Sequence, residues 1–161
     1  MRGDMIPEQK NYKTMFKKLF NKFSGKNIES MSFMESMNLT ELPVVTFYQE
    51  DKKFNFLLDT GSSDCIIDSN ILDQIEHKGS DLQSNLFGLE GKRRLVKACR
   101  ICLSYKGGQY EYDYLISDMK DAFTNIKQTT GVTLHGILGS KFFNTYKYVL
   151  DFDKMIAYSK L

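Results

Sequence analysis

Residues 55–64 read NFLLDTGSSD, a short apolar segment that runs directly into turn residues. The apolar run FLL ends in a carboxylate at Asp59, and Gly61 follows two residues later. A short apolar run bounded by turn residues is typical of a buried strand. Glycine lets the backbone turn where a side chain would clash, and the hydroxyls of Thr60 and Ser62 can hydrogen-bond locally. The stretch therefore predicts a strand that carries a half-buried carboxylate into a tight turn.

A second glycine-bearing motif lies downstream, where residues 136–143 read GILGSKFF. Residues 132–139 predict a buried strand that ends in a glycine turn, and residues 140–145 predict a helical turn. The Asp-Thr-Gly triplet by itself is weak evidence, because an ordinary turn that begins with Asp has the same residues. The combination of the two motifs is more specific.

Together these motifs resemble the retropepsin-like aspartic proteases. Residues 56–63, FLLDTGSS, are similar to the active-site strand and turn of that family. Residues 136–143 are similar to the strand that threads beside the turn and to the short helix after it. Residues 148–154, YVLDFDK, resemble the terminal hairpin of bacterial members. The resemblance covers residues 31–161 and leaves the first 30 residues uncovered.

The resemblance implies an all-β fold, namely a retropepsin-like closed β-barrel with one or two short helices. It places this protease domain at residues 31–161. Residues 1–30 are expected to be an N-terminal extension that contains a basic amphipathic helix.

The resemblance also implies an aspartic endopeptidase with Asp59 as its catalytic residue and with Thr60, Gly61 and Ser62 supporting the active-site turn. Chemistry of this kind needs two carboxylates that share one proton. No other aspartate in the chain is followed by Thr or Ser and then Gly. We therefore expect a homodimer in which Asp59 of each chain faces the other across a two-fold axis.

Two further segments take roles from the family. The segment 87–91 is the candidate flap over a peptide or protein substrate, because its glycines would let it move. The flap residues that we assign are Gly88, Leu89 and Gly91. The strand beside the active site is assigned to Ile137, Leu138 and Gly139.

The remaining elements are predicted from apolar periodicity and turn residues. Strands are expected over residues 31–34, 42–48, 54–58, 65–68, 94–104 and 109–116, and a closing hairpin over 146–151 and 154–159. A short helix is expected over 69–77, opening on a cap at Ser69 or Asn70, and a loop or short helix over 118–127.

Residues 10–26 have helical periodicity, with large apolar residues on one stripe and lysines 10, 13 and 17 largely on the other side. The stripe consists of Tyr12, Met15, Phe16, Leu19, Phe20 and Phe23. Such a helix either packs on its own domain or a partner subunit, or lies on an anionic membrane surface. We favour packing, because one short helix of this kind is common in soluble proteins.

Other candidate sites are weaker. Cys99 and Cys102 form a C-x-x-C pair, but they fall on opposite faces of a predicted strand, and the ligands of a closed zinc site are missing. His135 and Cys65 could be imagined as a catalytic pair, although a lone histidine in a strand is usually a core or edge residue. We therefore expect no metal and no cofactor.

Composition narrows the function classes further. The chain has 161 residues, a formal net charge of +2 and three cysteines. This charge gives no strong signal for nucleic acid, and an odd cysteine count without an apolar leader fits a cytoplasmic protein. The alternative function is a non-catalytic or latent retropepsin-like module that binds peptides or a partner protein, and the N-terminal helix would then block assembly or serve another role.

Overall fold

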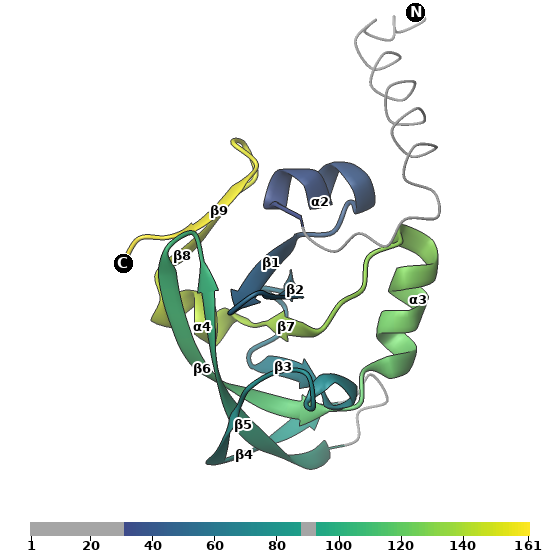
Figure 1. The fold of residues 1–161 in the computed structure, drawn as a ribbon, viewed down its shortest axis with the longest axis vertical. Helices are drawn as coiled ribbons and strands as arrows, with labels where there is room; N and C mark the ends of the chain where they lie inside the picture. Colours follow the sequence, from purple (N-terminus) through teal and green to yellow (C-terminus); the bar gives the residue numbers. More distant parts are fainter. Residues whose placement is uncertain (1–30, 88–92) are drawn as a thin grey trace, which may run out of the picture.

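A computed structural model describes residues 31–87 and 93–161 (Figure 1). The helices are α2 (Phe33–Thr40), the 3-10 helix η1 (Ser69–Ile71), α3 (Lys120–Thr130) and α4 (Ser140–Thr145). The strands are β1 (Val44–Gln49), β2 (Lys52–Leu58), β3 (Cys65–Asp68), β4 (Lys78–Phe87), β5 (Arg93–Tyr105), β6 (Gly108–Ser117), β7 (Gly136–Leu138), β8 (Tyr148–Asp151) and β9 (Ile156–Ser159). The helix predicted for residues 10–26 lies outside the described residues. No helix in the described ranges is long and apolar enough to cross a membrane.

Within the described residues, one sheet has the strand order β1-β2-β7-β3-β6-β5-β4, and β1 also pairs with β5. This pairing joins Tyr48 to Ser104, and the Ser104 hydroxyl donates a 3.1 Å hydrogen bond to the Tyr48 carbonyl. The sheet is therefore closed into a barrel, with β4 outside it. The prediction of an all-β closed barrel with short helices is confirmed. The closing hairpin is also confirmed, because β8 and β9 form a separate antiparallel pair.

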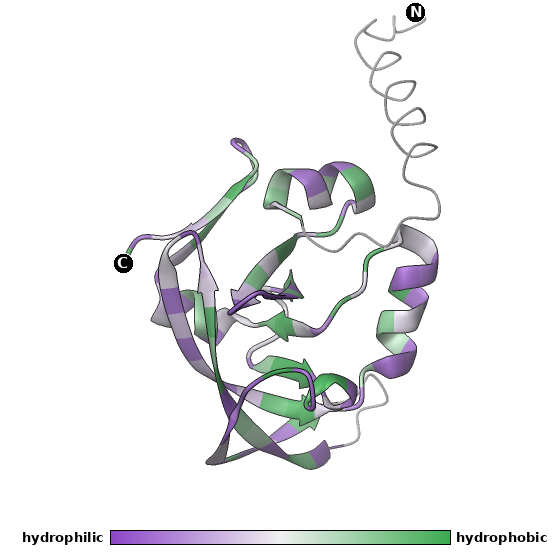
Figure 2. Cartoon of the chain, in the orientation of Figure 1, coloured by the Kyte–Doolittle hydropathy of each residue, from purple (hydrophilic) through white to green (hydrophobic). Residues whose placement is uncertain are grey.

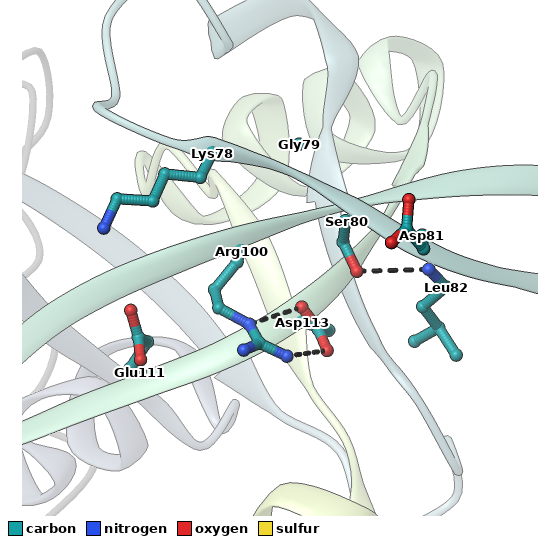
Figure 3. Close-up of a pocket in the computed structure, with 8 residues that line it drawn as sticks. All are labelled: Lys78, Gly79, Ser80, Asp81, Leu82, Arg100, Glu111 and Asp113. Carbon is teal, nitrogen blue, oxygen red and sulfur yellow. Dashed lines mark hydrogen bonds and ion pairs between the residues drawn. The ribbon is translucent and has the colours of Figure 1, made fainter.

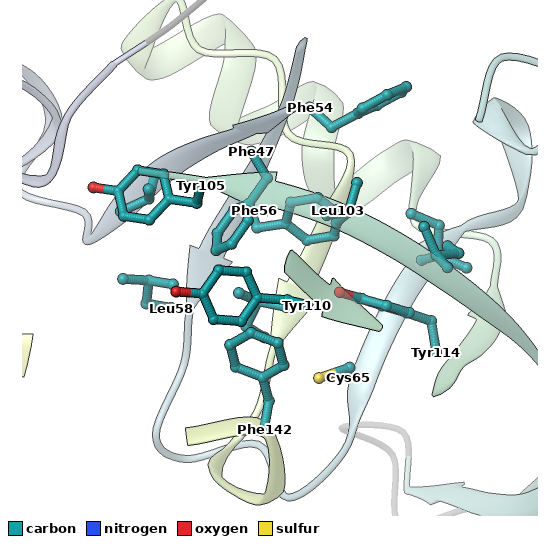
Figure 4. Packing of buried hydrophobic residues seen from close by; sticks show 14 of the residues in the cluster. Phe47, Phe54, Phe56, Leu58, Cys65, Leu103, Tyr105, Tyr110, Tyr114 and Phe142 are labelled. Carbon is teal, nitrogen blue, oxygen red and sulfur yellow. The ribbon is translucent and has the colours of Figure 1, made fainter. Parts of the chain in front are cut away.

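The interior of the barrel is aromatic (Figure 4). Phe47, Phe56 and Phe142 are fully buried, and the Phe47 ring meets Phe56 and Phe142 edge-on at centroid distances of 5.8 and 6.4 Å. Strand alternation supplies the inner face, because Cys99 and Leu103 point inward while Cys102 between them is exposed. Burial of apolar rings is the main stabilising term for such a core.

A second, smaller cluster lies under α3. Phe123 on this helix is buried against Val132, Leu134 and Ile137. Hydrophilic and hydrophobic residues alternate along α3, as Figure 2 shows, which is the pattern of a helix with one covered face. The predicted loop or short helix over 118–127 is thus a helix, Lys120–Thr130.

The strand predicted over residues 31–34 is wrong. The chain instead starts α2, because Ser32 and Glu35 form a capping box: the Ser32 side chain accepts from the Glu35 N–H, and the Glu35 carboxylate accepts from the Ser32 N–H. Phe33 on this helix is buried and meets the Phe152 ring edge-on at 5.3 Å. The Ser-x-x-Glu spacing was readable in the sequence and outweighs the local strand preference.

The helix predicted over residues 69–77 is also wrong. The structure has only the three-residue 3-10 helix Ser69–Ile71, and its cap is Asp68 rather than Ser69 or Asn70. The Asp68 carboxylate accepts from the Asn70 N–H at 3.2 Å and from the Met119 N–H at 3.1 Å, so it serves the start of η1 and of α3 together.

Two strands differ from the prediction, one because it was not predicted and one because it is shorter than predicted. Strand β4 was missed, because its residues are mostly polar and it is the outermost strand of the sheet. Strand β7 covers only Gly136–Leu138, whereas residues 132–139 were predicted as a strand. The chain before Gly136 instead makes side-chain hydrogen bonds to β2.

Candidate active site

Asp59 lies immediately after β2, at the start of a tight turn. Its N–H donates a 3.0 Å hydrogen bond to the Leu138 carbonyl, and its carbonyl accepts from the Ser62 N–H at 3.2 Å. The carboxylate oxygen Oδ1 accepts from the Gly61 N–H at 2.9 Å. Among the described residues no group donates to Oδ2. The side chain is therefore held at one oxygen and is half-buried.

Strand β7 threads through the loop that Asp59 begins. It pairs in parallel with β2, where Leu138 lies opposite Leu58, and antiparallel with β3, where Ile137 lies opposite Ile66. The strand therefore lies between the two strands that the turn connects. The structure places Ile137, Leu138 and Gly139 beside the Asp59 turn.

The loop closes tightly around Gly139. A Cβ atom at this position would lie 2.5 Å from the Asp64 carbonyl oxygen and 2.9 Å from that of Ser62, which is closer than side chains approach. The first N–H groups of α4 then bond the same loop, since Ser140 donates to the Ser62 carbonyl at 2.8 Å and Lys141 to the Ser63 carbonyl at 3.1 Å. Helix-end donors are thus satisfied by the turn itself.

The side chains that were expected to support the turn differ in their contacts. The Ser62 hydroxyl donates to the Asp64 carbonyl at 2.8 Å, so it braces the loop. A Cβ on Gly61 would lie 3.2 Å from the Asp59 carboxylate, so glycine gives the carboxylate room. Thr60 is exposed, and its hydroxyl has no hydrogen-bond partner among the described residues.

The sequence analysis missed an ion pair beside this turn. Lys141 Nζ lies 2.5 Å from Asp64 Oδ1, and Asp64 raises the pKa of Lys141. A lysine in the first turn of a helix is unfavourable to the helix dipole. The lysine at this helix position was therefore the sequence feature that could have indicated a neighbouring carboxylate.

Cys65 and His135 have separate partners. Cys65 Sγ lies 3.5 Å from the Gly139 N–H, and burial raises the pKa of the thiol to about 12, which keeps it from being a nucleophile. His135 Nδ1 instead accepts from the Asn55 N–H at 2.8 Å. The imagined catalytic pair is therefore not formed. Within the described ranges no group of three His, Cys, Asp or Glu side chains is placed to hold a metal ion.

The candidate flap residues Gly88, Leu89 and Gly91 lie outside the described residues. The strands on either side, β4 and β5, pair antiparallel up to Phe87 opposite Arg93, so this segment connects the two strands of a hairpin.

A surface hollow of about 550 Å³ lies on β4, β5 and β6 (Figure 3). Its centre is the Arg100 guanidinium, which binds both oxygens of Asp113 at 2.9 and 2.7 Å and lowers the pKa of that carboxyl. Lys78, Asp81 and Glu111 also line it. None of the described candidate site residues does, so the hollow is separate from the Asp59 turn.

No protein-family model and no curated protein sequence matches the chain. Among solved structures, EIAV protease complexed with the inhibitor HBY-793 is similar with a TM-score of 0.45 and 18% identity, over 67% of this chain and 90% of that chain. The retroviral protease-like domain of Ddi1 from Leishmania major is similar with a TM-score of 0.48 and 9% identity, over 74% and 88% of the two chains.

The site is built by β2, β3 and the strand β7, which lies between them. A strand that ends at an aspartate, a turn on glycine, and a later strand threaded through that turn are all present in one closed barrel. The described residues therefore form the all-β closed barrel that the sequence predicted, with a later strand threaded through the turn at Asp59.

Proposed function

We propose that the protein is an aspartic endopeptidase that works as a homodimer, with Asp59 of each chain in one shared active site. The observation that supports this most is the Asp59 carboxylate: Oδ1 is held by the Gly61 N–H, while Oδ2 has no donor among the described residues. A half-buried carboxylate that is held at one oxygen, and receives no donor at the other from the described residues, suits a group that must meet a water molecule and a second carboxylate.

In this proposal the two Asp59 side chains share one proton, because like charges at close range cannot both ionise. The ionised carboxylate takes a proton from a water molecule as the water oxygen attacks the peptide carbonyl carbon. The protonated carboxylic acid gives its proton to the carbonyl oxygen. As the resulting tetrahedral intermediate collapses, the carboxyl group that took the proton from water passes it to the amide nitrogen, and the C–N bond breaks to release the amine. The other carboxylate takes back a hydroxyl proton as the new carboxyl group forms, so the pair again shares one proton.

The other assigned residues take supporting roles. The exposed Thr60 reaches the turn of the partner subunit, Gly61 accepts the substrate backbone, and Ser62 braces the loop. Ile137, Leu138 and Gly139 hold the turn in place. Gly88, Leu89 and Gly91 form the flap over an extended peptide or protein substrate, which pairs its backbone along the cleft. A bacterial-type member, a cytoplasmic location and independence from metals and cofactors remain predictions.

The test is cleavage of a library of unfolded peptides by the full chain and by Asp59→Asn, from mildly acidic to neutral pH. We expect cleavage by the wild type, a rate that rises more steeply than linearly with protein concentration, and loss of activity in Asp59→Asn. Asp121→Asn is the matched control, because Asp121 is an exposed aspartate on α3. It should cleave like the wild type.

Mixing the two proteins tests the shared site directly. At a concentration where all chains are paired, an equal mixture of wild type and Asp59→Asn should retain about a quarter of the activity of the same total amount of wild type, because chains pair at random. If the mixture kept half of the wild-type activity, each chain would work alone. A folded wild-type dimer with no activity on any peptide would favour the alternative, a non-catalytic or latent module.

A further inference from the structure

His135 and Asn55 are joined by hydrogen bonds in both directions, at the point where β7 meets β2. The backbone N–H of Asn55 donates to the imidazole Nδ1 of His135 at 2.8 Å, and the backbone N–H of His135 donates to the backbone carbonyl of Asn55 at 2.9 Å. The Asn55 side-chain amide adds a 2.9 Å bond to the Thr133 carbonyl. These bonds hold the chain against β2 just before the short strand β7 begins.

The same connection continues to Asp59. After His135, the β2–β7 pairing runs from Phe56 opposite Gly136 to Leu58 opposite Leu138, and the next hydrogen bond is the one from the Asp59 N–H to the Leu138 carbonyl. On the other side of β7, the Asp68 N–H donates to the His135 carbonyl at 3.0 Å. His135 therefore fastens the beginning of a three-residue strand whose other end positions Asp59.

The role of the imidazole in this connection depends on its protonation. A ring nitrogen accepts a hydrogen bond only while it carries no proton, so the bond from Asn55 requires a neutral His135 with its proton on Nε2. A protonated ring would present an N–H to the N–H of Asn55. The charged form is thus incompatible with the connection that the structure shows.

The surroundings of the ring favour the neutral form. His135 is largely covered, and the Phe54 ring packs edge-on against it at a centroid distance of 5.5 Å. Burial is the main cause that lowers the pKa of His135, and it outweighs the hydrogen bond with the Asn55 backbone, which acts in the raising direction. The charged groups that act on it oppose each other, since Asp68 on β3 raises the pKa and Lys127 on α3 lowers it.

We propose that His135 is a positioning residue gated by pH: the neutral imidazole fastens β7 to β2 at Asn55, and its protonation loosens this junction and the placement of Asp59 that depends on it. The proposal concerns the fold of this chain and does not require that Asp59 be catalytic. It predicts an acid-sensitive junction next to the site that is set by a histidine and not by the carboxylates.

The sign of the effect follows from linkage. The unfolded chain binds a proton to His135 at about pH 6.5, whereas the folded chain binds it only at lower pH. Between these two values the unfolded state holds more protons, so acidification favours unfolding. The unfolding equilibrium constant should rise by up to about tenfold for each pH unit in that window, and the effect should be absent above it.

The variant that tests this is His135→Asn, because the Asn Oδ1 atom takes nearly the same place as His Nδ1 and accepts a hydrogen bond at every pH. Chemical unfolding of the full chain is measured between about pH 4 and 8. The matched control is His77→Asn, since His77 is exposed and lies outside this junction. The wild type and the His77 variant should lose stability below pH 6.5 more steeply than His135→Asn does.

A measurement on the wild type keeps the proposal testable if His135→Asn fails to fold. Nitrogen-15 shifts of the histidine rings report which nitrogen carries the proton, and exchange of the Asn55 amide reports the hydrogen bond. We expect His135 to be the Nε2–H tautomer at neutral pH, to titrate below 6.5, and to release the Asn55 amide as it does so. Titration at or above 6.5, or an Asn55 amide that stays protected through the titration, would overturn the proposal.

These measurements are independent of peptide cleavage. A protein that cleaves nothing but shows the expected titration would keep this inference and remove the proposed function. An active peptidase whose His135→Asn variant has the wild-type dependence of stability on pH would keep the proposed function and remove this inference.

Discussion

The backbone N–H of Asp59 donates to the carbonyl of Leu138 at 3.0 Å, so the residue that ends β2 is held by the last residue of β7. Because β7 begins at Gly136, far from Asp59 in the sequence, the position of this carboxylate depends on the completed barrel. A local Asp-Thr-Gly turn would fix the backbone but would leave the direction of the side chain relative to the barrel open.

The close contact at Gly139 predicts a large effect of one methyl group. Gly139→Ala places a Cβ 2.5 Å from the Asp64 carbonyl oxygen, and this backbone oxygen cannot move without opening the loop. We expect a loss of about 1–3 kcal/mol of unfolding free energy, measured by urea unfolding. Gly79→Ala is the control, because a Cβ there meets nothing within 4 Å. Equal stability of the two variants would contradict the threaded geometry.

A buried hydroxyl is expected to matter on the other side of β2. Thr46 is 2% exposed, and its Oγ1 donates to Asn55 Oδ1 at 2.6 Å and accepts from the Met31 N–H at 2.7 Å. Thr46→Val keeps the shape and removes both bonds, leaving buried polar groups unpaired. The expected cost is about 1–3 kcal/mol in the free energy of unfolding.

The control for this substitution is Thr129→Val, on the exposed side of α3. Its change in unfolding free energy should be small, since an exposed position leaves the freed carbonyl open to water. If Thr46→Val proves as mild as the control, the hydrogen bonds at Thr46 contribute little to the barrel.

The three cysteines should differ sharply in reactivity. Cys102 is exposed, whereas burial raises the pKa of Cys65 to about 12 and that of Cys99 to about 11. A thiol reagent acts on the thiolate, so at neutral pH the folded chain should react quickly at Cys102 alone. All three should react in denaturant. Folded Cys102→Ser should show no fast phase, and a second fast thiol in that variant would mean that a barrel strand opens readily.

The ion pair beside the Asp59 turn is expected to contribute little to stability. Lys141 Nζ lies 2.5 Å from Asp64, but 59% of the lysine side chain is exposed, so water and salt screen the attraction. Lys141→Met should change the unfolding free energy by less than about 1 kcal/mol. Lys154→Met, which removes a 3.7 Å pair with Asp151, gives a matched comparison. A clearly larger effect for Lys141, insensitive to salt, would show that this pair holds the loop.

Local patterns account for the elements that the sequence predicted well. The alternation of β5, in which Cys99 is buried and Cys102 exposed, follows directly from the period of a strand. The strand after Asp59 was predicted from its short apolar run, and all four of its residues are buried. The closing hairpin was predicted from two apolar runs around a polar turn. Strand β4 lacked such a signal, because a polar edge strand gains its structure from pairing with β5 and not from its own side chains.

Local residue patterns were enough to predict that Asp59 follows a buried strand in a glycine turn and that Gly139 follows another, because apolar runs and glycines act locally. Three features follow only from the folded barrel: β7 passes between β2 and β3, His135 bonds Asn55 rather than Cys65, and Lys141 pairs with Asp64. These contacts join residues far apart in the chain. Their partners are selected by barrel closure and by the pairing of buried polar groups. Both depend on the whole folded chain, so no single stretch of residues predicts them.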